Sequence, residues 1–266
     1  MESTLKYYDF EYMHRGKAVR ALPAEEMDLL KPIDNKGSGR NRALLLFHGF
    51  SSSPAVYRQL APSLTMYDAI VCPLLPGHGD SIDAFSKVNA TQWIECAEQT
   101  CEQLLNTYQS VDVLGLSLGG ILALHLSHRF RIHHLFLLAP ALSLCLNVHL
   151  TLFVTRLTYL LGVRYIPNKA GNIYTPGHPE LSYRQLPLKA AIEILTLIKT
   201  FQWSPPTCPV DVFLGRYDEV VHSTKVAALF SQLPNAQIHW LENSAHVLPL
   251  DGDVNEIIAC INGVNH

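Results

Sequence analysis

Short apolar segments alternate with segments of helical spacing along most of the chain, and this alternation constrains the fold more than any other feature. Segments such as Arg42–Phe47 (RALLLF) and His134–Leu138 (HLFLL) are apolar at nearly every position. Strands read this way when both faces of a sheet are covered. Helical stretches such as Gly119–Phe130 separate them. The pattern predicts an α/β fold whose mostly parallel sheet has helices on both faces.

Further predicted elements continue the alternation. A polar, glycine-rich loop at Asn35–Asn41 precedes the first strand of the sheet, and the segment before it is expected to hold one or two short strands. Thr91 has a residue type that N-caps favour and stands where a helix is predicted to begin. The remaining predicted strands are 68–73, 111–116, 210–214 and 237–241, and the remaining predicted helices are 54–64, 91–108, 223–233 and 254–261.

The alternation stops between Ala141 and Pro206. This stretch is helix-rich and irregular, with prolines at 167, 176, 179 and 187, and it is too long for an ordinary connection. We therefore expect an inserted helical cap over residues 141–206. Residues 1–140 and 207–266 are expected to form the core domain around it.

The segment Leu135–Thr155 contains no Asp, Glu, Lys or Arg and is long enough to raise the question of a membrane span. Pro140, Asn147 and His149 interrupt it, and Ala139-Pro140 is typical of a strand that ends in a turn. The segment is therefore interpreted as a buried strand followed by a hydrophobic helix. Such a helix is a candidate for transient contact with a lipid surface.

Composition narrows the functional classes. Hydrophobic residues make up 48% of the 266 residues and charged residues 16%, which favours a packed globule over disorder. The net charge of −3 comes without a basic patch, which argues against nucleic-acid binding. The six cysteines form no CxxC pair and no Cys/His cluster with zinc-ligand spacing. We expect reduced thiols, no metal or cofactor, and a cytoplasmic protein, since the N-terminus lacks the pattern of a secretion signal.

Ser117 stands in Gly115-Leu-Ser-Leu-Gly119, directly between a predicted strand and a predicted helix. A nucleophile on such a tight turn needs an unusual backbone conformation and small residues two positions away on each side. A serine that only capped the helix would not need glycine on both sides. We therefore predict that Ser117 is a nucleophile, which requires a base to take its proton.

Candidates for the acid and the base follow two later strands. Asp218 lies in the loop after 210–214, and His246 lies in the loop after 237–241. Catalytic groups gather at the carboxyl ends of strands in open α/β sheets. Asp211 falls within a strand instead, and Glu219 is expected to point elsewhere. The histidines at 133, 134, 149, 178, 222 and 239 have no comparable placement.

The negative oxygen that forms during acyl transfer needs two backbone N–H donors. Leu118, the residue after the nucleophile, is one natural donor. Phe50, in the loop after Arg42–Phe47, is the other, and Gly49 beside it permits close approach of the backbone.

Five segments together resemble the α/β-hydrolase superfamily and, more narrowly, bacterial carboxylesterases and monoacylglycerol lipases. They are FHGFSSSP, CPLLPGHGDS, GLSLGG, GRYDEVV and NSAHVLPLD, in this order. The resemblance runs from about Arg42 to the C-terminus and implies the same roles for Ser117, Asp218, His246, Phe50 and Leu118. It gives His78 and Asp80 a structural role only. Related enzymes usually have glycine where Ala245 stands, and the cap matches no segment of them.

The resemblance and the residues together predict a serine hydrolase. The expected substrates are short- to medium-chain acyl esters or monoacylglycerols, cleaved through an acyl-enzyme on Ser117 without cofactor or metal. A thioesterase, an amidase or peptidase, and a carbon–carbon bond hydrolase could use the same three residues. A non-catalytic receptor for ligands on the same scaffold is a further alternative, although such proteins typically lack one of the three.

Overall fold

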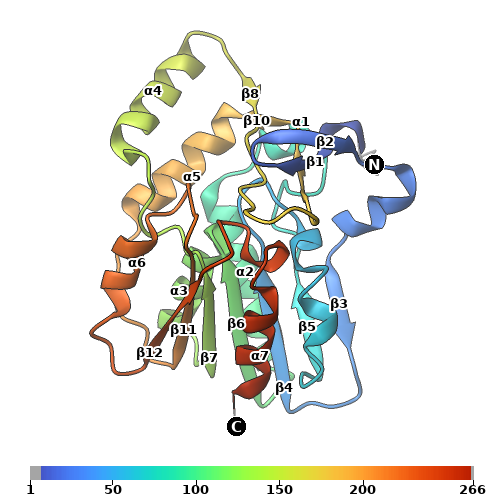
Figure 1. The fold of residues 1–266 in the computed structure, drawn as a ribbon, viewed down its shortest axis with the longest axis vertical. Helices are drawn as coiled ribbons and strands as arrows, with labels where there is room; N and C mark the ends of the chain where they lie inside the picture. Colours follow the sequence, from blue (N-terminus) through green and yellow to red (C-terminus); the bar gives the residue numbers. More distant parts are fainter. Residues whose placement is uncertain (1–6, 265–266) are drawn as a thin grey trace.

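A seven-stranded sheet forms the centre of the molecule in a computed structural model that describes residues 7–264 (Figure 1). Residues 1–6, where the sequence predicts no secretion signal, lie outside the described residues. The strand order is β12-β11-β7-β6-β4-β5-β3, and every neighbouring pair is parallel except β3 with β5. The strands are β3 (Ile33–Lys36), β4 (Arg42–Phe47), β5 (Ala69–Cys72), β6 (Ser110–Leu116), β7 (His134–Leu138), β11 (Val210–Gly215) and β12 (Ala236–Leu241).

Helices cover both faces of this sheet, as predicted. Alternate residues of β6 enter different cores: Val111 and Val113 pack on one face, and Leu114 and Leu116 on the other. This is the period-two alternation of a strand that is buried on both sides. The first core includes α2 (Ala90–Leu105), α3 (Leu118–Arg129) and α6 (Ser223–Phe230), and the second includes α7 (Val254–Gly263).

Three local predictions were wrong. The predicted loop at Asn35–Asn41 does not precede the whole sheet, since Asn35 and Lys36 belong to its edge strand β3 and pair with Ile70 and Ala69 of β5. The segment 54–64 forms two short 3-10 turns, Pro54–Tyr57 and Ala61–Ser63, because Pro62 lacks an N–H and its ring would clash inside a longer helix. Helix α2 is capped by Asn89 and not by Thr91. The Asn89 side chain accepts from the Gln92 N–H, and the Gln92 side chain accepts from the Asn89 N–H, each at 3.0 Å.

The inserted segment, Ala141–Pro206, leaves the sheet after β7 and returns at β11. It contains α4 (Val148–Leu160), β8 (Tyr165–Pro167), β9 (Glu180–Tyr183), β10 (Gln185–Pro187) and α5 (Leu188–Thr200). Asn147 interrupts the apolar segment and caps α4. Its side chain accepts from the Leu150 N–H at 3.0 Å. Helices α4 and α5 pack against each other above the sheet edge (Figure 1).

The part of the N-terminal segment before β3 does not join the central sheet. Its two strands, β1 (Phe10–His14) and β2 (Lys17–Ala21), form a three-stranded sheet in the order β2-β1-β9. Strand β1 therefore pairs antiparallel with a strand of the inserted segment, with Phe10 opposite Tyr183. Sequence alone predicted short strands here, and their partner comes from the structure.

Among the described residues, no helix combines the length and hydropathy that crossing a bilayer requires. The interpretation of Leu135–Thr155 as a buried strand and a separate hydrophobic helix is confirmed, because β7 is fully buried and α4 begins only at Val148. All six cysteines are free, and Cys72, Cys101 and Cys208 are buried.

Candidate active site

Ser117 stands at the sharp turn between β6 and α3 in a backbone conformation that side chains rarely adopt. Its φ is 54° and its ψ −109°. The turn is held by three backbone bonds: the Ser117 N–H donates to the Leu138 carbonyl at 3.0 Å, and its own carbonyl accepts from the N–H groups of Gly120 and Ala141 at 3.0 and 3.1 Å. A strained residue held this firmly is typical of a functional position.

Both glycines of the motif are required by close backbone contacts. A Cβ on Gly119 would lie 2.1 Å from the Phe47 carbonyl oxygen, and a Cβ on Gly115 would lie 2.1 Å from the Gly119 carbonyl oxygen. These distances are far below van der Waals contact. The steric argument made from the sequence for small residues around Ser117 therefore holds in the structure.

The loop after β4 lies beside this turn. A Cβ built on Gly49 would sit 3.6 Å from the Ser117 Cβ, so the residue before Phe50 is in contact with the serine. Leu118 is the first residue of α3, and N–H groups in the first turn of a helix have no acceptor within the helix. Gly49, the residue before Phe50, therefore lies beside Ser117, and the donor roles of Phe50 and Leu118 stay predictions.

Two buried histidines position this loop. His78 Nε2 accepts from the Ser51 N–H at 3.2 Å, directly after Phe50, and His48 Nε2 accepts from the Leu75 N–H at 3.2 Å. Burial lowers the pKa of His48 to about 4 and lowers the pKa of His78 well below its ordinary value. Neutral imidazoles can accept these bonds, which gives His78 a definite structural contact.

Asp218 and His246 form a hydrogen-bonded pair. His246 Nδ1 lies 2.8 Å from Asp218 Oδ2, and the Asp218 side chain is fully buried. The other carboxylate oxygen accepts from the N–H groups of Val220 and Val221, each at 2.8 Å. The carboxylate is held by three bonds and fixes the orientation of the imidazole, which leaves Nε2 as the nitrogen available for proton transfer.

The pKa of His246 is raised from its ordinary value. Burial lowers it, but the charge and hydrogen bond of Asp218 and the charge of Glu180 outweigh burial. Glu180 begins β9 in the inserted segment and is 6% exposed, and its Oε2 accepts from the Gly171 N–H at 2.8 Å. No sequence motif pointed to Glu180, because it lies in the inserted segment, which resembles none of the known motifs.

The loop that carries His246 is held by two further carboxylates. Asp251 accepts from the Ala245 N–H at 2.8 Å, and Asp253 accepts from the Asn243 N–H at 2.7 Å and the Ser244 hydroxyl at 2.9 Å. Asp251 closes the NSAHVLPLD segment quoted above, so the motif contained a signal for it. Ala245 is buried, and Gly215 leaves room for its carbonyl oxygen: a Cβ on Gly215 would lie 1.9 Å from that oxygen.

A cleft of about 660 Å³ is lined by chain neighbours of Asp218 and His246, whereas Ser117, Asp218 and His246 themselves are not among its lining residues. Tyr217, Glu219 and Ala245, the chain neighbours of Asp218 and His246, line one side of it. Residues of the inserted segment, such as Lys169 and Tyr174, and Arg15 in the turn between β1 and β2 line the other. The rings of Tyr174 and Tyr217 stack at 3.8 Å across it. The turn between the N-terminal strands and the inserted segment thus both contribute to this cleft.

Known proteins resemble this chain along most of its length. A thermostable monoacylglycerol lipase of Bacillus sp. (strain H-257) is 27% identical over 227 residues, which cover 81% of this chain and 86% of that protein. A carboxylesterase of Bacillus subtilis (strain 168) is 23% identical over 230 residues, covering 83% and 90%.

Solved structures share the fold. One, from a study of the metagenome-derived lipolytic enzymes LipS and LipT, has a TM-score of 0.79 at 23% identity and covers 88% of this chain and 98% of its own. The monoacylglycerol lipase of Paleococcus ferrophilus has a TM-score of 0.67 at 13% identity, with the same coverage of 88% and 98%. The predicted α/β-hydrolase fold is confirmed. Residues 44–257 match the sequence profile described as "Alpha/beta hydrolase family", and the chain belongs to that family.

Proposed function

We propose that the protein is a serine hydrolase that cleaves carboxylic esters through an acyl-enzyme on Ser117. The buried Asp218–His246 pair carries this proposal, because it provides an oriented base at the same edge of the sheet as the strained serine. The names of the two relatives, monoacylglycerol lipase and carboxylesterase, support esters as the substrate class.

In the proposed mechanism His246 Nε2 takes the proton of the Ser117 hydroxyl as Oγ attacks the ester carbonyl. The N–H groups of Phe50 and Leu118 donate to the oxygen that becomes negative. His246 then gives its proton to the leaving alcohol, and the carbon–oxygen bond of the ester breaks. Water repeats the sequence and releases the acid, while Asp218 stabilises the charged imidazole in both steps.

The substrate is proposed to be a short- to medium-chain acyl ester or a monoacylglycerol. We propose that residues 141–206 form a cap over a core made of residues 1–140 and 207–266, and that the cap shapes the acyl pocket. Glu180 supports a role of the cap at the active site, because this cap residue raises the pKa of His246 through its charge. Cytoplasmic location stays a prediction.

Hydrolysis of p-nitrophenyl butyrate by the wild type and by Ser117→Ala tests the proposal. We expect the variant to lose at least about 1000-fold in kcat/KM. Ser127→Ala is the matched control, because Ser127 lies in α3, the helix that follows Ser117, and its buried hydroxyl donates to the Leu124 carbonyl. Equal activity of wild type and Ser117→Ala would overturn the assignment. Comparing kcat/KM for matched ester, thioester and amide substrates then establishes which bond is preferred. A series of esters with different acyl chains establishes the preferred chain length.

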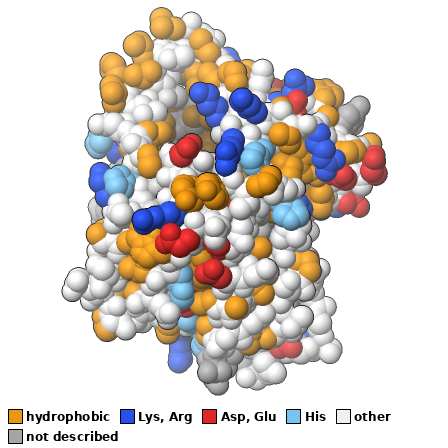
Figure 2. Space-filling view, viewed as in Figure 1, with side chains coloured by type: hydrophobic (Ala, Val, Ile, Leu, Met, Phe, Trp, Pro, Cys, Tyr) orange, Lys and Arg blue, Asp and Glu red, His pale blue; other side chains and the backbone are white. Residues whose placement is uncertain are grey.

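We also propose that α4 makes transient contact with lipid surfaces. Several of its apolar residues are exposed: Leu150 is 60% exposed, Phe153 65% and Leu160 81%. Figure 2 shows hydrophobic side chains gathered at the upper left, where Figure 1 has α4. Exposed apolar patches of this kind mark interaction sites.

Sedimentation with phosphatidylcholine liposomes tests this contact. We expect the wild type to sediment and the variant Phe153→Ser/Leu160→Ser to lose most of its binding. Val19→Ser is the control, since Val19 is 54% exposed on β2, outside α4. Failure of the wild type to sediment, or equal binding of the α4 variant, would contradict the proposal.

A further inference from the structure

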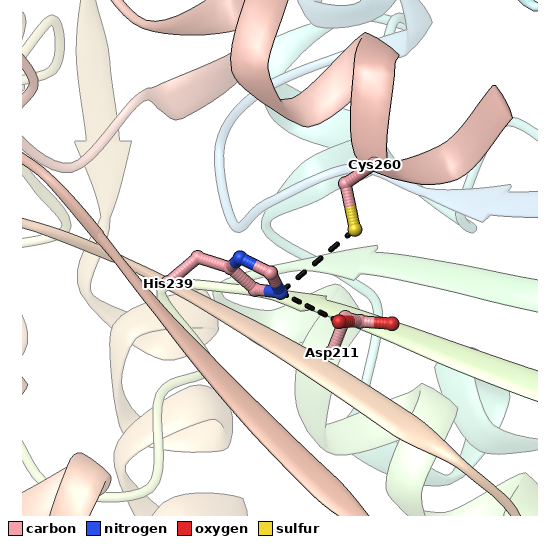
Figure 3. A group of neighbouring side chains, drawn as sticks. All are labelled: Asp211, His239 and Cys260. Carbon is pink, nitrogen blue, oxygen red and sulfur yellow. Dashed lines mark hydrogen bonds and ion pairs between the residues drawn. The ribbon is translucent and has the colours of Figure 1, made fainter. Parts of the chain in front are cut away.

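A second cluster of polar side chains lies near the amino ends of the strands, away from the candidate active site. Asp211 comes from the start of β11, His239 from β12 and Cys260 from α7 (Figure 3). One ligand atom from each lies within 4.8 Å of the other two. We propose that these three residues bind a divalent transition-metal ion of the zinc type.

The donor set selects this class of ion. A thiolate sulfur, an imidazole nitrogen and a carboxylate oxygen are the three ligand types that zinc accepts together. Calcium and magnesium prefer oxygen ligands only, so the cysteine and the histidine argue against them. Three protein ligands leave a fourth tetrahedral position for water.

The spacing of the donors is close to that of a tetrahedral site. Cys260 Sγ lies 3.8 Å from His239 Nε2, and zinc bond lengths of about 2.0–2.3 Å put neighbouring donors roughly 3.5 Å apart. His239 Nε2 lies 2.6 Å from Asp211 Oδ1, a hydrogen-bond distance. An ion between these atoms would bind the His239 tautomer that carries its proton on Nδ1, so that Nε2 is free, and would move the carboxylate back by less than about 1 Å. The thiol proton would leave to solvent.

Neighbouring groups hold the ligands in place. The second oxygen of Asp211 lies 2.7 Å from His134 Nε2, which orients the carboxylate. The His239 ring stacks on Phe213 at 4.6 Å. Ligands of metal sites are commonly supported by such outer contacts. The His239 side chain is 22% exposed, which gives an ion access from solvent.

The ligand spacing explains why the sequence predicted no zinc site. His239 is 28 residues from Asp211 and 21 residues from Cys260, and no short zinc pattern joins them. Two parallel strands and a helix packed over them create the cluster. Its ligands span the C-terminal part of the fold, so a bound ion would clamp α7 to the sheet and stabilise the native state.

Cobalt and zinc titrations of the full chain, freed of metal by a chelator, test the site. We expect one Co²⁺ per chain, with a thiolate-to-cobalt charge-transfer band that Zn²⁺ abolishes by displacing the cobalt. Cys260→Ser should lose the band, and His239→Gln should weaken Co²⁺ binding on the order of 100-fold. Cys96→Ser, at a partly buried cysteine of α2, should keep it. Zn²⁺ should raise the melting temperature of the wild type but not of Cys260→Ser.

Absence of the band in the wild type would overturn the proposal, as would a band that persists in Cys260→Ser. Circular dichroism shows whether each variant is folded. If Cys260→Ser does not fold, His239→Gln decides, since it keeps every cysteine and removes only the imidazole. Unchanged cobalt affinity in that variant would also overturn the site.

Discussion

At the residue scale, the candidate base is governed by two carboxylates from different parts of the chain. Asp218 comes from the loop after β11 and touches His246 directly, whereas Glu180 comes from the inserted segment and acts through its charge. Both stabilise the imidazolium and raise the pKa of His246 against the effect of burial. The acid limb of the activity profile should therefore lie above the ordinary range of histidine.

Glu180→Gln should move that acid limb to lower pH. A base must be neutral to accept a proton, so activity falls as the pH drops through the pKa of His246. Removing the Glu180 charge disfavours the imidazolium and should lower the midpoint by roughly 0.5 in pH. The kcat/KM–pH profile measures it. Glu219→Gln is the control, because that carboxylate is exposed and adjacent to Asp218. An unchanged midpoint in Glu180→Gln would contradict the argument.

The raised pKa of His246 also makes the stability of the fold depend on pH. A group whose pKa is raised in the folded state adds stability below its unfolded pKa, and the contribution is lost as the pH rises through the folded value. His246 should therefore stabilise the fold most in mildly acidic solution. Comparing the pH dependence of the melting temperature in wild type and His246→Ala measures this contribution.

At the scale of elements, the turn from β6 to α3 depends on backbone contacts that only glycine permits. Gly119→Ala should destabilise the protein by about 3 kcal/mol, because its Cβ would meet the Phe47 carbonyl oxygen at 2.1 Å. Gly263→Ala is the matched control, since nothing lies within 4 Å of its Cβ position at the end of α7. Urea unfolding distinguishes them, and equal stability of the two variants would contradict the steric argument.

The errors in the predicted elements have local causes. Periodicity identified the apolar face of 54–64 correctly, since Val56 and Leu60 are buried, but Pro62 prevents a continuous helix. At α2 the sequence predicted Thr91 as the cap, whereas Asn89 caps the helix through its reciprocal bonds with Gln92. Apolar spacing predicts which face is buried more reliably than where an element begins.

At the scale of the whole molecule, the N-terminal strand ties the inserted segment to the rest of the chain. Phe10 on β1 is buried, and its ring lies 4.3 Å from that of Tyr183 on β9. Phe10→Ala should destabilise the protein by about 3–5 kcal/mol, since it removes a buried aromatic side chain. Val19→Ala, at an exposed position of β2, should have little effect. Thermal unfolding measures both, and similar melting temperatures for Phe10→Ala and wild type would show that this contact is dispensable.

The sequence by itself determined six of the seven strands of the sheet, the helices α2, α3, α6 and α7, and the positions of Ser117, Asp218 and His246 at strand ends. These follow from periodicity and turn chemistry, which act between residues near in the chain. The catalytic roles of those residues stay predictions, although Asp218 and His246 are in hydrogen-bond contact. The tertiary structure alone brought Glu180 to the base, β1 to β9, and Cys260 to Asp211 and His239. Contacts between segments far apart in the chain depend on how helices and strands pack. The spacing of residues along the sequence does not predict that packing.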